Sequence, residues 1–317
     1  IIKRQFTQLI IFKIIITASL LSIGGYLVVS QQMNIGQFVA AEIIILLVIN
    51  SVEKIIIGLD TFYDVLTSVE KIGQVTDLTL EEEYDNDSID YCYSDISLET
   101  ENLQFKFPDA KNATLKAISL KIEQGERIII NGENGSGKTT LMRVLSGLLK
   151  PTTGSLFIND ATFKKIDLRQ YRSQIGSVIY GESPFEGTYL ENITFNDPAI
   201  TQEDLKWAIE GVQLSAFIKS LPDSLESPIF PEGRQLSSSN AQKILLARSI
   251  IHKPKILFYE DPTDTMDTNI ANAIIDFITD EAHKWTIIVS SKNPYWKTKC
   301  SREITMEKGR IVLDQQN

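Results

Sequence analysis

The chain has 317 residues and a formal net charge of −10 at pH 7, which argues against a nucleic-acid partner bound through a basic face. Its two cysteines, Cys92 and Cys300, lie far apart and give neither a disulfide framework nor the spacing of a metal site. We therefore expect two free thiols, in a chain whose length suits about two segments.

Two long apolar segments open the sequence. Residues 9–29 and 38–57 are each long enough to cross a bilayer, so membrane lipid is an expected partner. The alternative is a buried helical hairpin in a soluble protein. Charged groups inside a membrane usually face a bundle interior or a water-filled path. Four ionisable residues lie within these segments: Lys13, Glu42, Glu53 and Lys54.

The charges around the two segments predict their orientation. Lys3 and Arg4 precede the first span, and the loop between the spans carries no charge, so both ends are expected in the cytoplasm. Two spans cannot enclose a transport pathway, which implies partners or further spans upstream. The first residue, Ile1, is not Met, and this indicates a fragment or a processed product.

Beyond the second span the sequence predicts three further regions. Apolar residues between 57 and 69 keep helical spacing, so one long helix is expected to leave the membrane, and residues 1–78 form the membrane part. Residues 79–95 are acidic and poor in aliphatic side chains, as in a solvated linker. Residues 96–317 alternate short β-rich runs with helical stretches.

That alternation predicts an α/β domain with a mainly parallel sheet covered by helices. Residues 302–314 are expected to form a hairpin that turns at Lys308-Gly309. The β-rich runs are residues 126–132, 154–159, 175–180, 255–260 and 285–291.

A phosphate-binding loop is the strongest motif. Gly132-x-x-x-x-Gly137-Lys138-Thr139 matches the P-loop pattern, between an apolar strand and a helical pattern. Glycines allow backbone N–H groups to surround phosphate oxygens, the Lys138 ammonium reaches the β- and γ-phosphates, and the Thr139 hydroxyl can ligate Mg²⁺. The residues expected to bind nucleotide here are Gly132, Asn134, Gly135, Ser136, Gly137, Lys138, Thr139 and Thr140.

A P-loop domain that follows two membrane spans resembles the ATP-binding cassette (ABC) exporters, and the resemblance covers essentially the whole chain. It implies a P-loop NTPase fold of the ABC type with a helical subdomain, preceded by an all-α transmembrane segment. Residues 9–57 resemble the last two spans of an exporter half. The cofactors implied are ATP and Mg²⁺, and the implied place is the cell membrane, as a multi-pass protein with its nucleotide-binding domain in the cytoplasm.

Two further segments match the family at positions that contact nucleotide. Phe107, shortly after the first strand of the domain, stands where the family places an aromatic ring against adenine; a strand residue of the core is the alternative. The family signature Leu-Ser-Gly-Gly-Gln corresponds to residues 236–240, "LSSSN". The Ser237 hydroxyl is kept, but Ser238 and Ser239 replace both glycines and restrict close approach of the backbone to phosphate.

The residues expected at the cleavage machinery depart from the family pattern. The resemblance places Tyr180 where the Q-loop Gln offers its amide to Mg²⁺ and the attacking water. It places Lys292 at the switch histidine, where a lysine supplies charge but not the two roles of a neutral imidazole. A surface lysine without a role is the alternative for Lys292.

The strand at residues 256–260 ends in two acids whose order is exchanged. Counting back from Asp267 assigns Glu260 to the magnesium position and Asp261 to the catalytic base, whereas the family has Asp first and Glu second. The other register assigns Asp261 to magnesium and leaves Pro262 at the base position. Positioned acid–base groups contribute roughly 10²–10⁴ in rate and must lie within hydrogen-bond reach, so the exchanged side-chain lengths affect hydrolysis.

The changes therefore fall on hydrolysis more than on nucleotide capture. One hypothesis is an exporter subunit that binds Mg-ATP, dimerises with a second ABC half of the same or another sequence, and hydrolyses slowly. A second is a non-hydrolysing subunit of a heteromeric transporter. A third, a soluble ABC ATPase, is disfavoured by the two spans and the acidic charge. No residue identifies the transported substrate.

Overall fold

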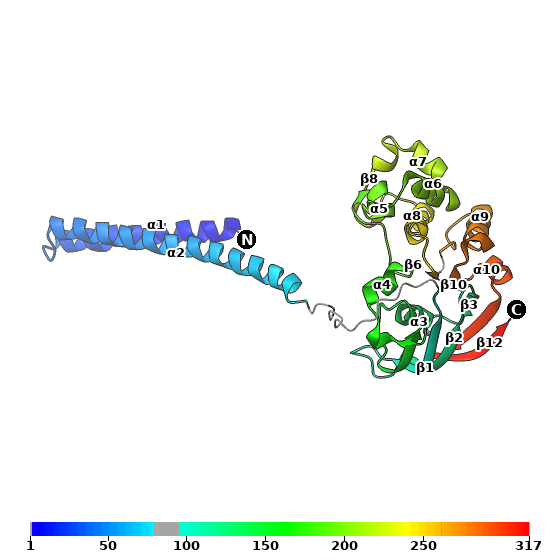
Figure 1. Cartoon of the computed structure of the whole chain (residues 1–317). Coiled ribbons are helices and arrows are strands. Elements are labelled where there is room, and N and C mark those ends of the chain that lie inside the picture. The colour runs from blue at the N-terminus through cyan, green and yellow to red at the C-terminus, as the bar shows by residue number, and fades with distance from the viewer. Residues whose placement is uncertain (1, 79–80, 82–94, 261, 317) are drawn as a thin grey trace. The chain divides into compact units, whose positions relative to one another are not determined.

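The computed structural model describes residues 2–78, 81, 95–260 and 262–316, and the side chains of these residues except 2–9, 53, 56, 57 and 60. The chain divides into two compact units, Ile1–Glu82 and Glu83–Asn317, which are coloured in chain order in Figure 1. The predicted linker, residues 79–95, lies almost entirely outside the described residues.

Two long helices, α1 (Ile2–Val29) and α2 (Ile35–Thr76), make up the first unit. α2 begins at a capping box in which Asn34 accepts the Gln37 N–H at 2.8 Å and Gln37 accepts the Asn34 N–H at 3.1 Å. The helix then continues through residue 76 without a break, which agrees with the one long helix predicted from the sequence.

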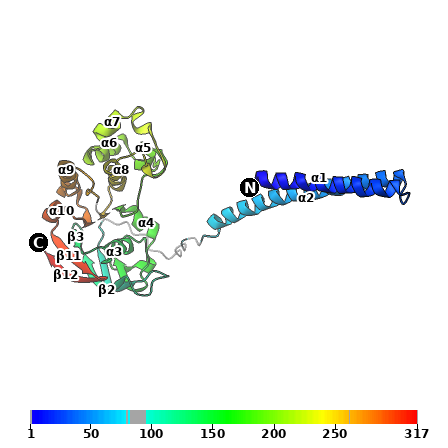
Figure 2. The ribbon, with the colours of Figure 1, turned by 180° about the vertical axis from the view of Figure 1, so that it is seen from behind.

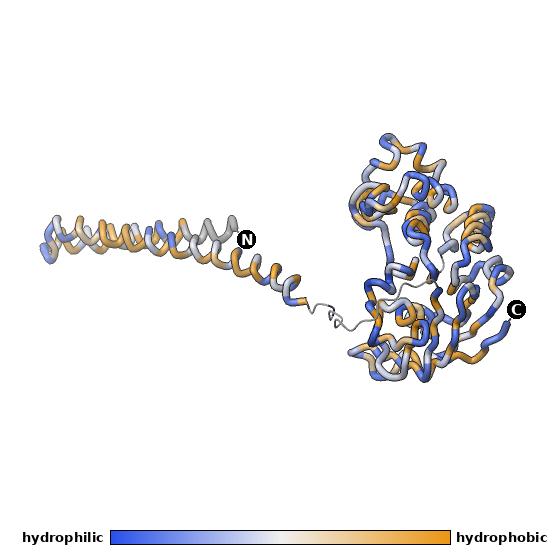
Figure 3. Tube along the Cα trace, in the orientation of Figure 1, coloured by the Kyte–Doolittle hydropathy of each residue, from blue (hydrophilic) through white to orange (hydrophobic). Residues whose placement is uncertain are grey.

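Both helices are apolar on faces that the described chain leaves exposed. Ile10–Val29 and Ile35–Val52 have the length and hydropathy of membrane spans, and Figure 3 shows the apolar residues along them. Only 6% of the first segment and 0% of the second are buried. The core helix of a soluble protein would be mostly buried, so this exposure favours lipid or further helices as their surroundings.

A six-stranded sheet organises the second unit, with strand order β12-β11-β3-β10-β9-β6. The pairs between neighbours from β11 to β6 are parallel. The β11–β12 pair is the antiparallel hairpin predicted at residues 302–314. The strands are β3 (Arg127–Asn131), β6 (Ile175–Val178), β9 (Ile256–Glu260), β10 (Thr286–Ser290), β11 (Arg302–Glu307) and β12 (Arg310–Gln316).

A separate antiparallel sheet has the order β2-β1-β4-β5. Its strands are β1 (Leu98–Phe105), β2 (Leu115–Ile122), β4 (Thr153–Ile158) and β5 (Ala161–Thr162). The run at residues 154–159, expected in the parallel sheet, belongs here as β4, so that part of the prediction was wrong. In the last four residues of β4 half-buried and buried positions alternate, the pattern of a strand with one face to the core, whereas β9 is buried on both faces.

Helices cover the parallel sheet on both faces, because its strands send alternate residues into two hydrophobic clusters. Ile128 of β3 joins the cluster that includes the antiparallel sheet and α3, whereas Ile129 joins the cluster under α8 and α9. Figures 1 and 2 show α5 to α8 gathered away from β1 and β2. The helices are α3 (Lys138–Leu145), α4 (Leu168–Ser173), α5 (Tyr189–Thr194), α6 (Gln202–Gly211), α7 (Ser215–Ser220), α8 (Ser238–Ile250), α9 (Thr268–Ile278) and α10 (Pro294–Lys299).

Short elements complete the second unit. A two-stranded ladder joins β7 and β8, and single 3₁₀ turns connect the longer elements. They are β7 (Gly187–Thr188), β8 (Pro228–Ile229), η1 (Phe163–Lys165), η2 (Ser224–Glu226), η3 (Pro231–Gly233) and η4 (Glu281–His283).

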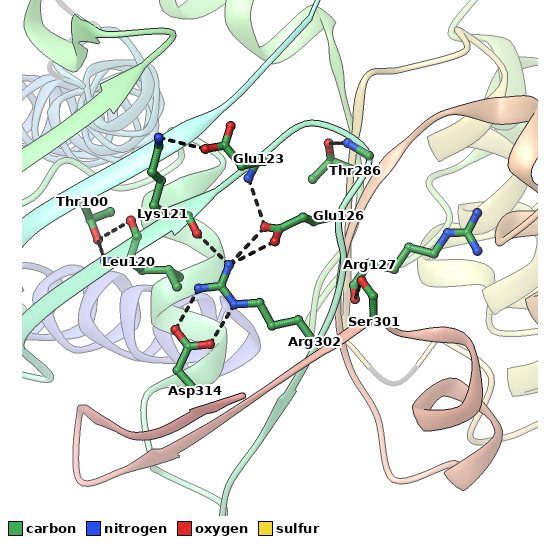
Figure 4. Close-up of polar contacts among 11 residues, drawn as sticks. Thr100, Leu120, Lys121, Glu123, Glu126, Arg127, Thr286, Ser301, Arg302 and Asp314 are labelled. Atoms are coloured by element: carbon green, nitrogen blue, oxygen red, sulfur yellow. Dashed lines mark hydrogen bonds and ion pairs between the residues drawn. The ribbon is translucent and has the colours of Figure 1, made fainter. Parts of the chain in front are cut away.

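Arg302 of β11 joins the two sheets through a network of charged hydrogen bonds (Figure 4). Its guanidinium donates to both Asp314 oxygens, at 2.7 and 2.8 Å, and to the Lys121 carbonyl of β2 at 2.8 Å. It also donates to both Glu126 oxygens, at 3.1 and 3.3 Å. Bonds to Asp314 and Glu126 raise the pKa of Arg302, whose side chain is only 14% exposed. The network fixes the sheets that hold the P-loop.

Candidate functional site

The candidate site lies where four parallel strands end. β3, β6, β9 and β10 are neighbours in one sheet and point the same way, so the segments that follow them meet at one edge. These segments contain the P-loop after β3, Tyr180 after β6, Glu260 at the end of β9 and Lys292 after β10. The strand ends thus bring together residues that are up to 160 positions apart.

The P-loop turns tightly between β3 and α3. Gly132 has φ +145°, and a Cβ there would lie 2.3 Å from the Met306 carbonyl oxygen of β11. Gly137, the residue before α3, has φ +103°, and a Cβ there would lie 3.1 Å from Leu115 Cδ2. Only glycine suits a left-handed backbone with a neighbour this close, so both positions keep the loop narrow.

The ammonium group of Lys138 is held by the loop itself. Its Nζ donates to the carbonyl oxygens of Gly132 at 2.7 Å and Glu133 at 2.9 Å. The Ser136 carbonyl accepts the Gly309 N–H at 2.9 Å, which ties the loop to the β11–β12 hairpin. The backbone of the loop therefore holds the Lys138 ammonium beside itself, where a phosphate-binding lysine is expected.

Glu260 connects three parts of the site. One carboxylate oxygen accepts the Thr139 hydroxyl of α3, and the other accepts the Tyr180 backbone N–H at 3.1 Å. The Tyr180 carbonyl in turn accepts from Arg143, also on α3, at 2.9 Å. The Tyr180 ring is 79% exposed, so only the main chain of this residue is held in the site.

Two clefts meet at the P-loop, and Asn134, Lys138 and Glu260 line both of them. The larger, of about 660 Å³, also includes Thr139, Thr140, Gly135, Gly137, Tyr180 and Gln242. The smaller, of about 490 Å³, also includes Gly132, Ser290, Ser291, Lys292, Lys297 and Glu303. The structure therefore assembles most of the predicted phosphate, magnesium and switch positions around one space.

A buried acid forms part of the smaller cleft. Glu303 of β11 is 7% exposed; one oxygen accepts from Asn131 at 2.7 Å, and the other pairs with Lys297 at 2.7 Å. The Lys297 ammonium, followed by the Asn131 amide, lowers the pKa of Glu303. Lys292 lies in the same cleft, so this side of the P-loop carries two lysines in addition to Lys138.

Two predicted nucleotide contacts lie apart from the described clefts. Phe107 is 39% exposed and meets Phe105 edge to face, with ring centroids 4.8 Å apart. Ser237 caps α8 by accepting the Asn240 N–H at 3.2 Å. Ser238 begins α8 and is exposed. The adenine and signature assignments therefore remain predictions.

Asp261, the predicted catalytic base, lies outside the described residues. Glu260, the predicted magnesium ligand, ends β9 beside Thr139. A hydroxyl together with a carboxylate suits a hard cation such as Mg²⁺. Among the described residues no group of three His, Cys, Asp or Glu could hold a metal ion, so a cation here would need ligand oxygens from elsewhere.

The residues present fit Mg-ATP by their chemistry. At Gly132 and Gly137 the P-loop leaves no room for a Cβ, and loops of this kind can turn their backbone N–H groups toward phosphate oxygens. Lys138 supplies a positive charge beside them, and Thr139 with Glu260 supplies oxygen donors. Each of these residues was identified from the sequence.

Several residues of the site were missed at the sequence level. Arg143 lies one helical turn beyond Thr139, and that spacing is a signal that could have identified it. Gln242 lies one turn into α8, and Glu303 occurs in a strand pattern with no local mark of function. Such contacts depend on packing between elements that are distant in sequence.

The described thiol has no role in the site. Cys300 is a buried cysteine that forms no disulfide with another described residue, and burial raises its pKa to about 12. A thiol with such a pKa stays protonated and unreactive near neutral pH. This agrees with the free thiol expected from the sequence, while Cys92 lies outside the described residues.

Comparisons with known proteins give one consistent result. Residues 115–264 match the family model described as ABC transporter. The chain is 29% identical over 294 residues to the alpha-hemolysin translocation ATP-binding protein HlyB of Escherichia coli O157:H7, covering 92% of this chain and 41% of that protein. It is also 29% identical over 290 residues to the leukotoxin translocation ATP-binding protein LktB of Mannheimia haemolytica, with the same coverage.

A solved structure shares the fold. A bacterial Atm1-family ABC exporter with ATP bound superposes with a TM-score of 0.72 at 21% identity, covering 79% of this chain and 44% of that chain. The chain spans about two-fifths of the length of the curated relatives it matches.

Proposed function

The chain belongs to the ABC transporter family through residues 115–264, and on this premise we propose that it is the ATP-binding subunit of an ABC exporter. In this role it couples ATP binding, and slow hydrolysis, to transport across the membrane. The observation that carries the proposal is the P-loop with Lys138, Thr139 and Glu260 assembled around one pair of clefts.

The residues divide the work of holding Mg-ATP. Backbone N–H groups of the P-loop and the Lys138 ammonium would bind the phosphates, while Thr139 and Glu260 would hold Mg²⁺. When bound, Mg²⁺ would neutralise the charge that develops on the transferred phosphoryl group. Lys292, which lines the smaller cleft, would add positive charge there, and Asp261 is the proposed base.

The two membrane helices support the exporter assignment. Two spans do not enclose a pathway, so we propose that they pack with further spans and with a second ABC transporter half. Residues of the second unit would then lie in the cytoplasm. The exposed apolar faces of α1 and α2 supply the surface for lipid and for neighbouring spans.

A second candidate is a nucleotide-binding subunit that does not hydrolyse ATP and regulates a competent partner. One observation favours it: the 79% exposed ring of Tyr180 is not held in the site, where the resemblance implies an amide that orients water. Only the Tyr180 main chain contacts Glu260. The two candidates share nucleotide binding and differ in turnover.

Binding and turnover of Mg-ATP by the full chain in lipid nanodiscs test the proposal. Lys138→Ala removes the charge at the phosphates and is expected to weaken binding by about 10- to 100-fold, since hydrogen bonds to charged groups contribute roughly 1.5–3 kcal/mol. Lys206→Ala, at an exposed lysine of α6, is the control and leaves binding unchanged.

The outcomes separate the candidates. Turnover that disappears in Lys138→Ala supports the hydrolysing exporter subunit. Binding that depends on Lys138 without turnover supports the regulatory subunit. Nucleotide binding that is absent, or that is the same in both variants, contradicts both.

A further inference from the structure

The two oxygens of the Glu260 carboxylate serve two different segments. Oε1 accepts the hydroxyl of Thr139, the expected magnesium ligand, and Oε2 accepts the backbone N–H of Tyr180 at 3.1 Å. A side chain at the end of β9 therefore joins the P-loop helix to the loop that follows β6. Nothing in the role of a magnesium ligand requires the second of these bonds.

The segment held by this bond is a tight turn, residues 179–182. The Ile179 N–H donates to the Glu182 carboxylate at 3.1 Å, and the Glu182 N–H donates to the Ile179 carbonyl at 3.2 Å. Arg143 holds the Tyr180 carbonyl at 2.9 Å. The turn is thus fixed internally and anchored at both polar groups of the Tyr180 backbone, while the ring of that residue points into solvent.

The length of Glu260 makes this anchoring possible. The distance of 3.1 Å from Tyr180 N to Glu260 Oε2 is already near the long end of an N–H···O bond. An aspartate carboxylate would end about 1.5 Å short, one carbon–carbon bond, and could not reach Thr139 and Tyr180 together. The acid order that departs from the family pattern therefore has a structural consequence.

The turn leads directly into the helical subdomain. Phe185 donates its N–H to the side chain of the fully buried Asn192 in α5, at 2.9 Å. Arg248 of α8 donates to the Asn192 carbonyl at 2.7 Å, and α8 begins next to Ser237. These contacts run without a gap from the turn to α8, the helix that carries the signature segment, so a shift of the turn can be passed on to that helix.

We propose that Glu260 is a positioning residue that anchors the turn 179–182 through its reach to the Tyr180 N–H, in addition to its proposed role at magnesium. The anchor replaces, through the main chain, a connection that the Tyr180 ring does not make. The inference rests on the proposed function only for the identity of the bound ligand, because the bond between Glu260 and the Tyr180 N–H is made within the chain itself.

Two variants separate reach from charge. Glu260→Asp keeps the carboxylate but loses the reach. Glu260→Gln keeps the reach without the charge: its amide oxygen can accept the Tyr180 N–H while its NH₂ group donates to the Thr139 hydroxyl. Amide hydrogen exchange of Tyr180 in the nucleotide-free full chain, in nanodiscs, measures the anchor directly.

We expect Glu260→Asp to raise the exchange rate of the Tyr180 amide about tenfold, because loss of one such bond corresponds to roughly 1.4 kcal/mol. Glu260→Gln is expected to stay within about threefold of the parent, while its Mg-ATP binding falls. Equal exchange in Glu260→Asp and the parent overturns the proposal. Equally fast exchange in both variants also overturns it, because the charge and not the reach would then hold the turn.

A third variant tests whether Glu260 and Arg143 hold the same turn. Arg143→Ala removes the anchor at the Tyr180 carbonyl and leaves Glu260 untouched. If both anchors hold one turn, the increase in the Tyr180 exchange rate in the double variant Arg143→Ala/Glu260→Asp differs from the product of the two single increases. A double variant whose increase equals that product contradicts a shared turn. Failure of nucleotide binding in the parent would contradict the proposed function alone, since the exchange measurement uses no nucleotide.

Discussion

The P-loop and the loops that face it hold the same site by different means. The P-loop is shaped largely by its main chain: glycine occupies its two tightest positions, and backbone carbonyls hold the Lys138 ammonium. Opposite it, Tyr180 contributes its main chain alone, and Lys292 contributes a side chain of another chemical type from the expected imidazole. Backbone capture of phosphate tolerates changes nearby, whereas acid–base roles depend on particular side chains.

The most severe test of this comparison is Gly132→Ala. The added Cβ would lie 2.3 Å from the Met306 backbone oxygen, at a φ of +145°, so β3 or β11 must shift. We expect nucleotide binding to fall by more than about 100-fold and stability to fall by roughly 1–3 kcal/mol, the cost of overpacking. Equilibrium binding and thermal unfolding of the full chain measure the two effects.

Gly125→Ala is the matched control for Gly132→Ala. Gly125 also has a positive φ, +75°, but nothing lies within 4 Å of its added Cβ, and it is in the turn before β3. This variant should lose some stability from backbone strain and keep its nucleotide affinity. If Gly132→Ala behaves like Gly125→Ala in binding, then the narrow P-loop is not what captures phosphate.

The next test replaces the two side chains that differ from the family pattern, Tyr180 and Lys292, with those of the family. Tyr180→Gln combined with Lys292→His supplies the amide and the imidazole, and we expect hydrolysis to rise about 10- to 100-fold, because positioned groups contribute roughly 10²–10⁴ each at best. Binding of Mg-ATP should change by less than about threefold. Phosphate release measured beside binding distinguishes the two quantities.

The matched control for that exchange is Tyr180→Phe combined with Lys292→Arg, which alters the same positions without supplying either group. Its hydrolysis should equal that of the parent. A rise in both variants would mean that the two positions limit turnover through size or mobility, and the contrast between main-chain capture and side-chain catalysis would lose its support.

The parts of the molecule that the sequence predicted are those whose determinants are local. The P-loop motif lies within eight consecutive residues, and the hairpin at Lys308-Gly309 is set by a turn between two short strands. Both appear in the structure. β4 was assigned to the wrong sheet because its pairing with β1, about 50 to 60 residues away, leaves no local signal.

The site follows the same division. Lys138, Thr139 and Glu260 could be placed from strand ends and motif spacing. The bonds from Glu260 and Arg143 to the Tyr180 main chain could not, because a backbone acceptor or donor carries no sequence signal. Glu303 was missed since its burial and its pairing with Lys297 depend on strand order.

A smaller effect on binding, together with a clear effect on stability, is expected for Arg302→Leu. The substitution leaves the carboxylates of Asp314 and Glu126 without their guanidinium partner, at a side chain only 14% exposed. Removing one partner of a buried ion pair costs about 3–5 kcal/mol, and partial exposure here reduces this to roughly 2–3 kcal/mol. Urea unfolding of the full chain should show the loss, with Mg-ATP affinity kept within about threefold.

Arg302→Lys provides the comparison for that variant, since it restores one charge but not the two-pronged bond to Asp314. Its stability should lie between those of the parent and Arg302→Leu. If Arg302→Leu abolishes nucleotide binding while the protein remains folded, the joint between the two sheets is part of the phosphate site and not only its support.

The smallest effect concerns pH, at a group of rings that lines neither of the two clefts. His283 stacks on Trp285, with ring centroids 4.3 Å apart, and also meets Trp207 and Phe277. Burial among these rings lowers the pKa of His283, against the opposite pull of the Asp280 carboxylate. A histidine whose pKa is depressed on folding contributes stability above its unfolded pKa, about 6.5, and this contribution is lost as the pH falls through the folded pKa.

The thermal midpoint of the parent should therefore fall between pH 7.5 and pH 5.5 by more than that of His283→Phe, whose ring keeps the stacking and cannot be protonated. The comparison of the two proteins cancels His252, which is present in both. Mg-ATP affinity should be equal in the two proteins at each pH, because none of these rings lines either of the clefts at the P-loop. A difference in affinity that follows the difference in midpoint would show that capture depends on the helical layer as well.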